Sequence, residues 1–331
     1  MPVMGIWLDI QELPVGDQVQ LYERMLMFGW FRRMGQQLRP EPPTVREVRE
    51  ARFAEGLRCP RCQSHDVVRH GRMGTRQRYR CRGCGKTFND LTGTPVAYSK
   101  HPRLWIEMAE AMAEGLSIPK TAERLHVSRD TVFRWRHRLL DAMRRGDLPQ
   151  LAGVVEADET YFPYSRKGQR GQPRRRRGVR QRKLRGLSRQ QVAVLTVRDR
   201  DHVETAVTVL GRGYPRYSVV GPALGQVLEP DPETVLCADG ARHYQRFCQD
   251  QGIQYRRVDP DADAIHPIFH IQHVNSYHDR LKRWMPRFRG VSTTRLPNYM
   301  TWHEFIDRNR HLSRRLLARE LLKASCASMP R

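Results

Sequence analysis

The pattern of apolar and polar positions predicts three consecutive helices in the first half of the chain. Apolar residues recur at helical spacing over residues 102–114, over Ile118–Leu125 and over Arg129–Met143. Ser117 and Ser128 stand directly before the second and third stretches, where a serine can cap a helix N-terminus. Because only His126 and Val127 separate the second stretch from the second serine, we expect a tight turn between these two helices.

This arrangement fits a helix-turn-helix, whose second element enters the major groove of DNA. In the third stretch Val132, Trp135 and Leu139 recur at spacings of three and four, so they are expected to face the core. The exposed residues that would contact DNA near the start of that helix are Arg129, Asp130, Thr131 and Arg134. An ordinary three-helix bundle is the alternative. We favour DNA binding because the bundle stands beside a cysteine-rich region in a basic chain.

From residue 151 onward, strand-like apolar runs alternate with helical stretches, which indicates an α/β or α+β core. A strand that carries acids comes first, followed by two strands, a longer connection, a strand that ends in an acid, a helix, a strand and a helix. This order matches an RNase H-like sheet. The strands are expected at 153–162, Gln191–Val197, Val203–Leu210, Thr234–Gly240 and Ile253–Val258, with a helix at Ala241–Gln251.

Two aspartates are candidates for catalysis. Asp158 lies in the middle of an apolar strand, where an unpaired charge is costly, and Asp239 ends another strand. In an RNase H-like sheet they would lie side by side, and two carboxylates at one point can hold two Mg2+ or Mn2+ ions roughly 4 Å apart. Singly, Asp158 could be a salt-bridged strand residue and Asp239 the start of an Asp-Gly turn. The strand order favours catalysis.

A third ligand is expected on the helix that follows the last strand. In the segment His270–Trp284, Asn275, His278, Asp279 and Lys282 stand at i, i+3, i+4 and i+7, which places them on one helical face. That face could direct a ligand at the metal ions and a lysine at DNA. The alternative is a solvated polar face.

The cysteines predict a structural zinc site. Cys59, Cys62, Cys81 and Cys84 form two C-x-x-C pairs, and the gap between the pairs falls in the range of four-cysteine zinc sites. Four thiolates satisfy tetrahedral Zn2+ and leave no open position, so the ion would be structural; redox chemistry or chance pairing are the alternatives. The basic strand between the pairs, with Arg78, is expected to contact the DNA backbone.

The charge of the chain indicates a polyanionic partner. Among 331 residues, 59 are Lys or Arg and 35 are Asp or Glu, which gives a formal net charge of +24. Nucleic acid is the usual partner of such a surface, and an anionic membrane is the weaker alternative. Part of the charge lies between residues 163 and 189, which hold no acidic residue. We expect this insert to be a solvated loop that tracks phosphates, with Arg174, Arg175, Arg176 and Arg177 among its DNA contacts.

The motifs together resemble the bacterial insertion-sequence transposases of the DDE superfamily that carry an N-terminal zinc ribbon and an ISXO-like catalytic domain. The matching features are the two C-x-x-C pairs, the runs 156–161 and 238–240, and the block from His273 to Arg283 with Gly290–Thr293, Leu296–Tyr299 and Trp302. The resemblance covers roughly residues 57–309.

The resemblance implies DNA cleavage at the ends of the element, followed by attack of the released 3′ hydroxyl on target DNA. It implies that Asp158 and Asp239 bind the catalytic metal ions. It also implies that the third position, often Asn or His in this group, is His278, with Asn275 as the next choice and Lys282 one turn on. Double-stranded DNA carrying the terminal inverted repeats and the target would be the partner. The protein would act as a homodimer or higher oligomer, in the cytoplasm at the bacterial nucleoid, because its start shows no signal peptide.

The expected architecture is therefore multidomain: a zinc ribbon, a helix-turn-helix and an α/β RNase H-like catalytic core. We expect a helical region at 1–55, the ribbon at 56–98, the helix-turn-helix at 99–148, the catalytic domain at 149–311 and a basic, fraying helical tail at 312–331. Two other functions stay open. One is a transposase-derived DNA-binding regulator without catalysis, and the other is an RNase H-like nuclease or resolvase without strand transfer.

Overall fold

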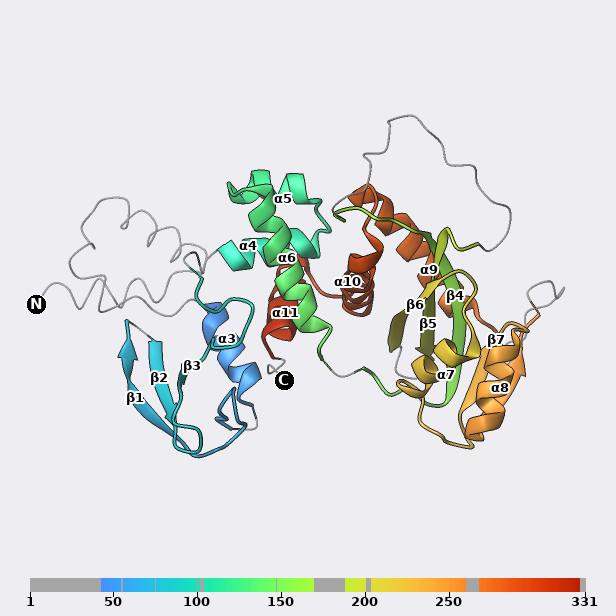
Figure 1. Cartoon of the computed structure of the whole chain (residues 1–331), viewed down its shortest axis with the longest axis horizontal. Helices are drawn as coiled ribbons and strands as arrows, with labels where there is room; N and C mark the ends of the chain where they lie inside the picture. Colours follow the sequence, from blue (N-terminus) through green and yellow to red (C-terminus); the bar gives the residue numbers. More distant parts are fainter. Residues whose placement is uncertain are drawn as a thin grey trace, which may run out of the picture. The chain divides into compact units, whose positions relative to one another are not determined.

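The computed structural model describes residues 43–54, 56–74, 76–99, 101, 104–146, 148–169, 188–200, 204–259 and 268–327. The chain divides into two compact units, the first up to Thr92 and the second from Gly93 to Met329 (Figure 1). Each unit is described separately below. Among the residues described, no helix has the length and apolar character needed to cross a membrane.

The first unit contains a short helix and a three-stranded antiparallel sheet. The helix is α3 (Pro43–Arg52), and the strands β1 (Val67–Met73), β2 (Arg76–Cys81) and β3 (Thr87–Asn89) pair in the order β1-β2-β3. The predicted strand through Gln77–Cys81 is confirmed as β2. Its buried core is small, consisting of Cys59, Cys81 and Phe88. A core of this size needs additional stabilisation, such as a structural metal ion, to be stable.

The second unit begins with the predicted helices α4 (Leu104–Ala113), α5 (Ile118–Leu125) and α6 (Arg129–Met143). The predicted cap at Ser128 is confirmed, because its Oγ accepts the backbone N–H of Thr131 at 3.1 Å. The helix-turn-helix geometry is therefore present, with α6 as its second element.

The predicted side-chain cap at Ser117 is wrong. Ser117 has the extended backbone of a cap residue but makes no side-chain cap hydrogen bond. Pro119 occupies the second helical position and removes one of the two N–H groups that a cap serine can accept; Ser117 does not accept the other, that of Lys120. Only the Ser117 carbonyl takes part, as it accepts from Thr121 N and Thr121 Oγ1, both at 2.9 Å.

The C-terminal helix belongs to this helical bundle. Residues Arg314–Ala327 form α11, which packs mainly against α4 and also against α6. Its buried face includes Leu317, Leu321, Leu322 and Cys326. The expectation of a fraying basic tail is thus wrong for the residues described, because an apolar stripe runs between the basic positions.

A five-stranded mixed sheet forms the rest of the second unit, in the order β6-β5-β4-β7-β8. Strands β4, β5 and β6 are antiparallel neighbours, while β7 and β8 run parallel to β4. This is the predicted RNase H-like topology. The strands are β4 (Val154–Pro163), β5 (Gln191–Asp199), β6 (Thr205–Arg212), β7 (Val235–Ala238) and β8 (Gln254–Arg257).

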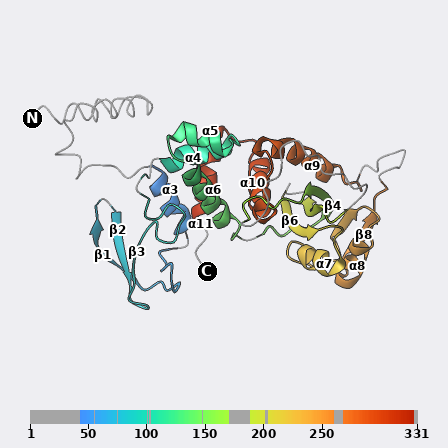
Figure 2. The ribbon, with the colours of Figure 1, turned by 45° about the horizontal axis from the view of Figure 1, so that its top comes forward.

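Helices cover both faces of this sheet (Figures 1 and 2). Helices α7 (Tyr217–Gly225) and α8 (Arg242–Gln251) bury one face, where residues such as Val155, Ala157 and Leu236 form the main core. Helix α9 (Gln272–Trp284) contacts β4 and β5, and its polar contacts are with the alternate residues of β4. Helix α8 was predicted, whereas α7, which contains Pro222, was expected only as a longer connection.

Helix α10 (Leu296–Arg308) joins the helical bundle to the sheet, because it packs against both β6 and α6. Two short 3-10 helices, η2 (Met285–Phe288) and η3 (Thr293–Arg295), lie between α9 and α10. On the α6 side, Asn298 Nδ2 donates to His137 Nδ1 at 3.0 Å and to Asp141 Oδ1 at 2.8 Å.

Several expectations fall outside the residues described. These are the N-terminal helical pattern before residue 43 and the basic insert from 170 to 187, including Arg174, Arg175, Arg176 and Arg177.

Candidate active site

The sheet places Asp158 and Asp239 at the same level on neighbouring strands. Ala157 of β4 pairs with Ala238 of β7 in a parallel register, and the two aspartates are the next residues of their strands. Adjacent strands lie about 4.8 Å apart, so the two side chains start from neighbouring positions where β7 ends. The register therefore places the two residues at the same level of neighbouring strands, as the strand order predicts.

Asp239 lies where negative charge accumulates. Burial raises its pKa above the ordinary value, the backbone N–H of Ala241 opposes this shift, and the carboxylates of Asp158 and Glu159 raise the pKa further. Ala241 N donates to Asp239 Oδ1 at 3.0 Å, so the residue also starts the expected turn. On the main chain, the Asp239 carbonyl accepts the hydroxyl of Tyr255. The carboxylate is therefore fixed in orientation, beside other acids.

Helix α9 brings His278 to Asp158. His278 Nδ1 lies 3.5 Å from Asp158 Oδ2, and its Nε2 lies 3.0 Å from Thr196 Oγ1 on β5. Thr196 is the antiparallel partner of Asp158, so the imidazole contacts two paired strand residues. Its side chain is 5% exposed, against 22% for Asp158. Of the third-ligand candidates on α9, His278 is the one that the structure places against an aspartate.

The other candidates on α9 are solvent-exposed. Asn275, Asp279 and Lys282 are exposed, whereas His278 is buried. The four positions therefore do not behave as one polar face: His278 stands at the edge of that face, next to the buried stripe that includes Val274 and Leu281. Asn275 and Lys282 lie on the same helix as His278. Among the described residues, His278 is the one of these three that contacts Asp158.

Two acids of the same strand were not singled out from the sequence. Glu159 accepts from His243 Nε2 of α8 at 2.8 Å, and both side chains are 5% exposed. Glu156, two residues before Asp158, is fully buried. A signal for both was present, since apolar strands rarely carry three acids in four residues, but their partners lie far away in the sequence.

The described residues contain two groups in which at least three potential ligand atoms lie within 4.8 Å of one another. One is the four cysteines; the other is Glu156 with His270 and His273. Asp158, Asp239 and His278 are more widely spaced than either group.

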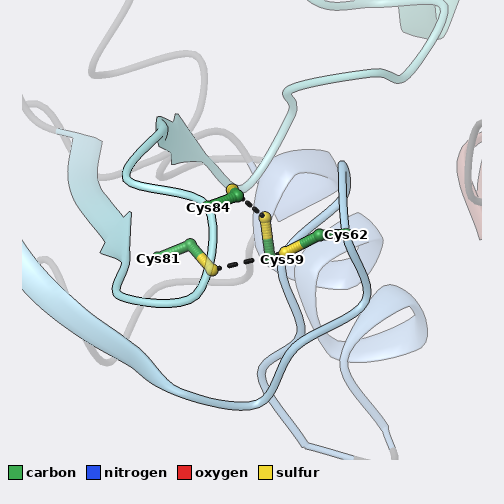
Figure 3. A group of neighbouring side chains, drawn as sticks. All are labelled: Cys59, Cys62, Cys81 and Cys84. Carbon is green, nitrogen blue, oxygen red and sulfur yellow. Dashed lines mark hydrogen bonds between the residues drawn. The ribbon is translucent and has the colours of Figure 1, made fainter.

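The cysteine cluster has the form of a zinc ribbon. Cys59 Sγ lies 3.7 Å from Cys84 Sγ and Cys62 Sγ 3.5 Å from Cys81 Sγ, so each contact joins one C-x-x-C pair to the other (Figure 3). The backbone N–H of Cys84 lowers the pKa of the Cys81 thiol to about 7, whereas the pKa of Cys62 is raised, because hydrogen bonds to the other thiols outweigh the backbone N–H of Ser64. The sulfur atoms face one another across a small gap, as tetrahedral coordination requires.

The candidate DNA contacts of α6 lie near its start. Arg129 and Arg134 are exposed. Thr131 is half-buried, and its hydroxyl lies 2.9 Å from Ser128 Oγ, so part of its polar capacity serves the helix cap. In the first unit, Arg78 of β2 is half-buried and donates to Thr87 Oγ1 at 3.3 Å.

Three family models match the chain. Residues 150–306 match the ISXO2-like transposase domain, residues 102–149 a homeodomain-like domain of the helix-turn-helix type, and residues 56–85 the InsA N-terminal domain, a zinc ribbon. A protein in transposable element ISH50 of Halobacterium salinarum is 30% identical over 257 residues, which covers 76% of this chain and 85% of that protein. The chain belongs to the insertion-element transposases with an ISXO2-like domain.

Other similarities are partial or remote. The InsA protein of insertion element iso-IS1N from Shigella dysenteriae is 37% identical over 79 residues, which is 24% of this transposase and 84% of InsA. Among solved structures, a pre-cleavage Mos1 transpososome has 12% identity and a TM-score of 0.24 over 61% of this chain and 76% of that chain. An intasome of simian T-cell lymphotropic virus has 12% identity and a TM-score of 0.29, over 59% and 64%. The topology above, rather than these structural matches, defines the fold.

Proposed function

We propose that this transposase cleaves DNA at the ends of its insertion element and joins those ends to target DNA, with Asp158, Asp239 and His278 as its metal ligands. The observation that carries the proposal is the shared level of the two aspartates on β4 and β7, with His278 of α9 packed against Asp158. Membership of the family supports it.

The donor set fits divalent cations. Three carboxylates, those of Asp158, Glu159 and Asp239, act on one another, and their mutual repulsion contributes to the raised pKa of Asp239. A bound cation relieves that repulsion, and carboxylate oxygens suit Mg2+ or Mn2+. Two such ions would activate the attacking oxygen and stabilise the leaving oxygen of a phosphodiester.

The remaining work of the site is positioning. The Ala241 N–H holds one oxygen of Asp239, and Thr196 holds the imidazole of His278, so the ligands are oriented before any ion binds. Lys282 is exposed one turn beyond His278 and would hold a DNA phosphate. Lys167, four residues after β4, donates to the carbonyls of Arg289 and Gly290, at 2.6 and 3.1 Å, and so ties this segment to the loop after η2.

DNA would be held by the two smaller modules. We propose that Arg129, Thr131 and Arg134 of α6 read or contact the terminal inverted repeats, and that Arg78 contacts the backbone. The exposure of Arg129 and Arg134 at the start of the second helix of the motif supports this. Zn2+ on the four cysteines would fold the ribbon. Pairing two element ends requires a homodimer or higher oligomer, and this remains a prediction.

A plasmid that carries both element ends, with the DNA found beside the reading frame, tests the proposal. Purified zinc-loaded protein is incubated with Mg2+ or Mn2+, or with neither, and cleaved and joined products are separated on gels. Metal is omitted rather than chelated, because chelation would also strip zinc. We expect Asp158→Asn and Asp239→Asn each to lower cleavage more than the roughly 100-fold loss typical of outer-shell partners.

Asp279→Asn is the matched control, because this acid stands beside His278 in sequence but is 67% exposed and pairs only weakly with Arg283, at 4.0 Å. Normal cleavage by both Asp158→Asn and Asp239→Asn would end the assignment. Cleavage without joined products would indicate a nuclease, and DNA binding without cleavage a regulator.

The third ligand is tested by comparing His278→Ala with Asn275→Ala. We expect His278→Ala to raise the metal concentration needed for half-maximal cleavage, since the imidazole is the side chain of α9 that contacts Asp158. Asn275→Ala, at an exposed position, should leave that concentration near the wild-type value. The reverse result would move the third ligand to Asn275.

A further inference from the structure

A second carboxylate of β4 is wholly buried and saturated with hydrogen bonds. Glu156 is 0% exposed. Its Oε2 accepts the backbone N–H groups of His273 at 2.9 Å and Val274 at 3.1 Å. Its Oε1 accepts from Arg200 Nε at 2.9 Å and from His273 Nδ1 at 2.7 Å. These bonds reach across 117 residues of sequence for His273 and 44 for Arg200.

Glu156 supplies the N-terminal cap that α9 lacks locally. The residue at the cap position is Ile271, whose side chain has no acceptor. The first N–H groups of a helix have no partner within the helix. Those of His273 and Val274 donate to Glu156, and the anion also complements the positive end of the helix dipole. The flanking amides have local acceptors: Gln272 N donates to His270 Nδ1 at 3.3 Å, and Asn275 N to the Ile271 carbonyl at 3.0 Å.

Glu156, His270 and His273 are spaced closely enough to hold a metal ion, but the hydrogen bonds argue against such a site. An ionised carboxylate offers about four lone-pair positions. Two backbone N–H groups, Arg200 and His273 Nδ1 already use four, and His270 Nδ1 also lies 3.2 Å from Oε1. A cation would have to displace Arg200, which is 15% exposed and also donates to the carbonyls of Ile268 and His270. The cluster is an anchor.

The two contact points between α9 and β4 have nearly the same spacing on the helix as on the strand. Glu156 and Asp158 are two residues apart on one strand face, or about 6.6 Å. Val274 and His278 are four residues apart on α9, or about 6 Å. Helix α9 therefore meets β4 at two points whose separations agree: the Glu156 cap at its start, and the contact of His278 with Asp158 at 3.5 Å one turn later.

We propose that Glu156 is a positioning residue, which fixes the register of α9 against β4 and thereby holds His278 beside Asp158. The inference deepens the proposed function and rests on it, because the place of His278 matters for chemistry only if the site binds metal. Glu156 itself touches neither metal nor DNA.

The cap is tested first by hydrogen exchange, without any metal or DNA. In the full-length wild-type chain, the amides of His273 and Val274 should be protected although they belong to the first turn of a helix. Glu156→Gln keeps the shape but loses the charge and one acceptor, and should speed their exchange at least 10-fold. Glu204→Gln is the control, since this carboxylate pairs with Arg308 and not with α9. Rapid exchange of both amides in the wild-type chain would overturn the cap.

The link to His278 is tested by a double-mutant cycle on Mn2+ affinity, measured by electron paramagnetic resonance with the cysteine site already loaded with zinc. Glu156→Gln should weaken Mn2+ binding by about 10- to 100-fold, as loss of an outer-shell partner does. In a His278→Ala background the same change should cost less than about 2-fold, because the residue it positions is gone. An equal cost in both backgrounds would show that Glu156 does not act through His278.

The failures are distinguishable. If the wild-type chain binds Mn2+ no better than Asp158→Asn, the metal centre of the proposed function is wrong, and the positioning role falls with it even if the cap is real. If the wild-type chain binds Mn2+ but Glu156→Gln does too, only the positioning role is wrong. Should Glu156→Gln fail to fold, Glu156→Asp keeps the charge on a shorter side chain and enters the same cycle.

Discussion

The C-terminal helix gives the sharpest test of how the helix-turn-helix is stabilised. Leu321 of α11 is 0% exposed, while Leu316, five residues earlier on the same helix, is 46% exposed. Replacing a fully buried leucine by alanine costs about 2.7–5 kcal/mol, from lost burial and the cavity left behind. The same change at Leu316 should stay within about 0.5 kcal/mol.

For a unit of this size, about 2–4 °C are lost per kcal/mol, so Leu321→Ala should lower the melting temperature by roughly 5 to 20 °C. Thermal unfolding followed by circular dichroism, with Leu316→Ala as the matched control, measures the difference. Equal melting temperatures for the two variants would refute the packing of α11 against α4 and α6.

A truncation before Ser313 separates a packed helix from a basic tail. If the segment contributed charge alone, low salt would strengthen the remaining contacts and largely restore DNA binding. Since α11 instead packs on α4 and α6, the truncated chain should lose DNA binding at every salt concentration and show reduced helix content. Recovery of binding at low salt would contradict this.

Three further outcomes are expected. Removing zinc with a strong chelator should unfold the ribbon and leave the second unit folded, as seen by limited proteolysis of the two units. Ser128→Ala should destabilise the second unit by about 1 kcal/mol, through loss of the bond to Thr131 N, whereas Ser117→Ala should have little effect in the same melting assay. Burial lowers the pKa of His137 from 6.5 to about 4, so its contribution to stability is full above pH 6.5 and is lost as pH falls toward 4. In His137→Gln, unfolding between these pH values should take up about one proton fewer, so the melting temperature should depend less on pH.

Burial and the charge of Arg295 lower the pKa of His137, and its hydrogen bond with Asn298 fits the same neutral form. Asn298 Nδ2 can only donate, and it donates to His137 Nδ1 as well as to Asp141. A proton on Nδ1 would replace that bond with a clash between two donors, at a site where the ring is 3% exposed. If the pH dependence of wild type and His137→Gln were the same, this account would be wrong.

Local periodicity was sufficient for most elements. The helices α5 and α6 begin and end at the predicted residues, and the strands β4 to β8 differ from prediction by about two residues at their ends. Each of these elements carries its own apolar pattern and turn signals, so neighbouring residues alone specify it. The order of these elements along the chain then predicted an RNase H-like sheet, in which Asp158 and Asp239 lie at the same level.

What periodicity missed depends on distant partners. Ile271 gives no sign that α9 has a cap, because the cap is Glu156, on a strand 115 residues earlier. The stripe of α11 that includes Leu317 and Leu321 was hidden by arginines, whose long side chains can lie beside a packed face. His278 is buried at the edge of a polar face because it contacts Thr196 and Asp158, and these partners cannot be inferred from neighbouring residues in the sequence.

Helix α10 packs against both the helical bundle and the five-stranded sheet. Trp302 is 0% exposed, donates its indole N–H to the Met112 carbonyl at 3.2 Å, and stacks under the Arg136 guanidinium at 4.8 Å. On the sheet side, Asp307 of the same helix binds Arg280 of α9 through both carboxylate oxygens. One helix thus contacts the bundle that would hold DNA and the helix that carries His278.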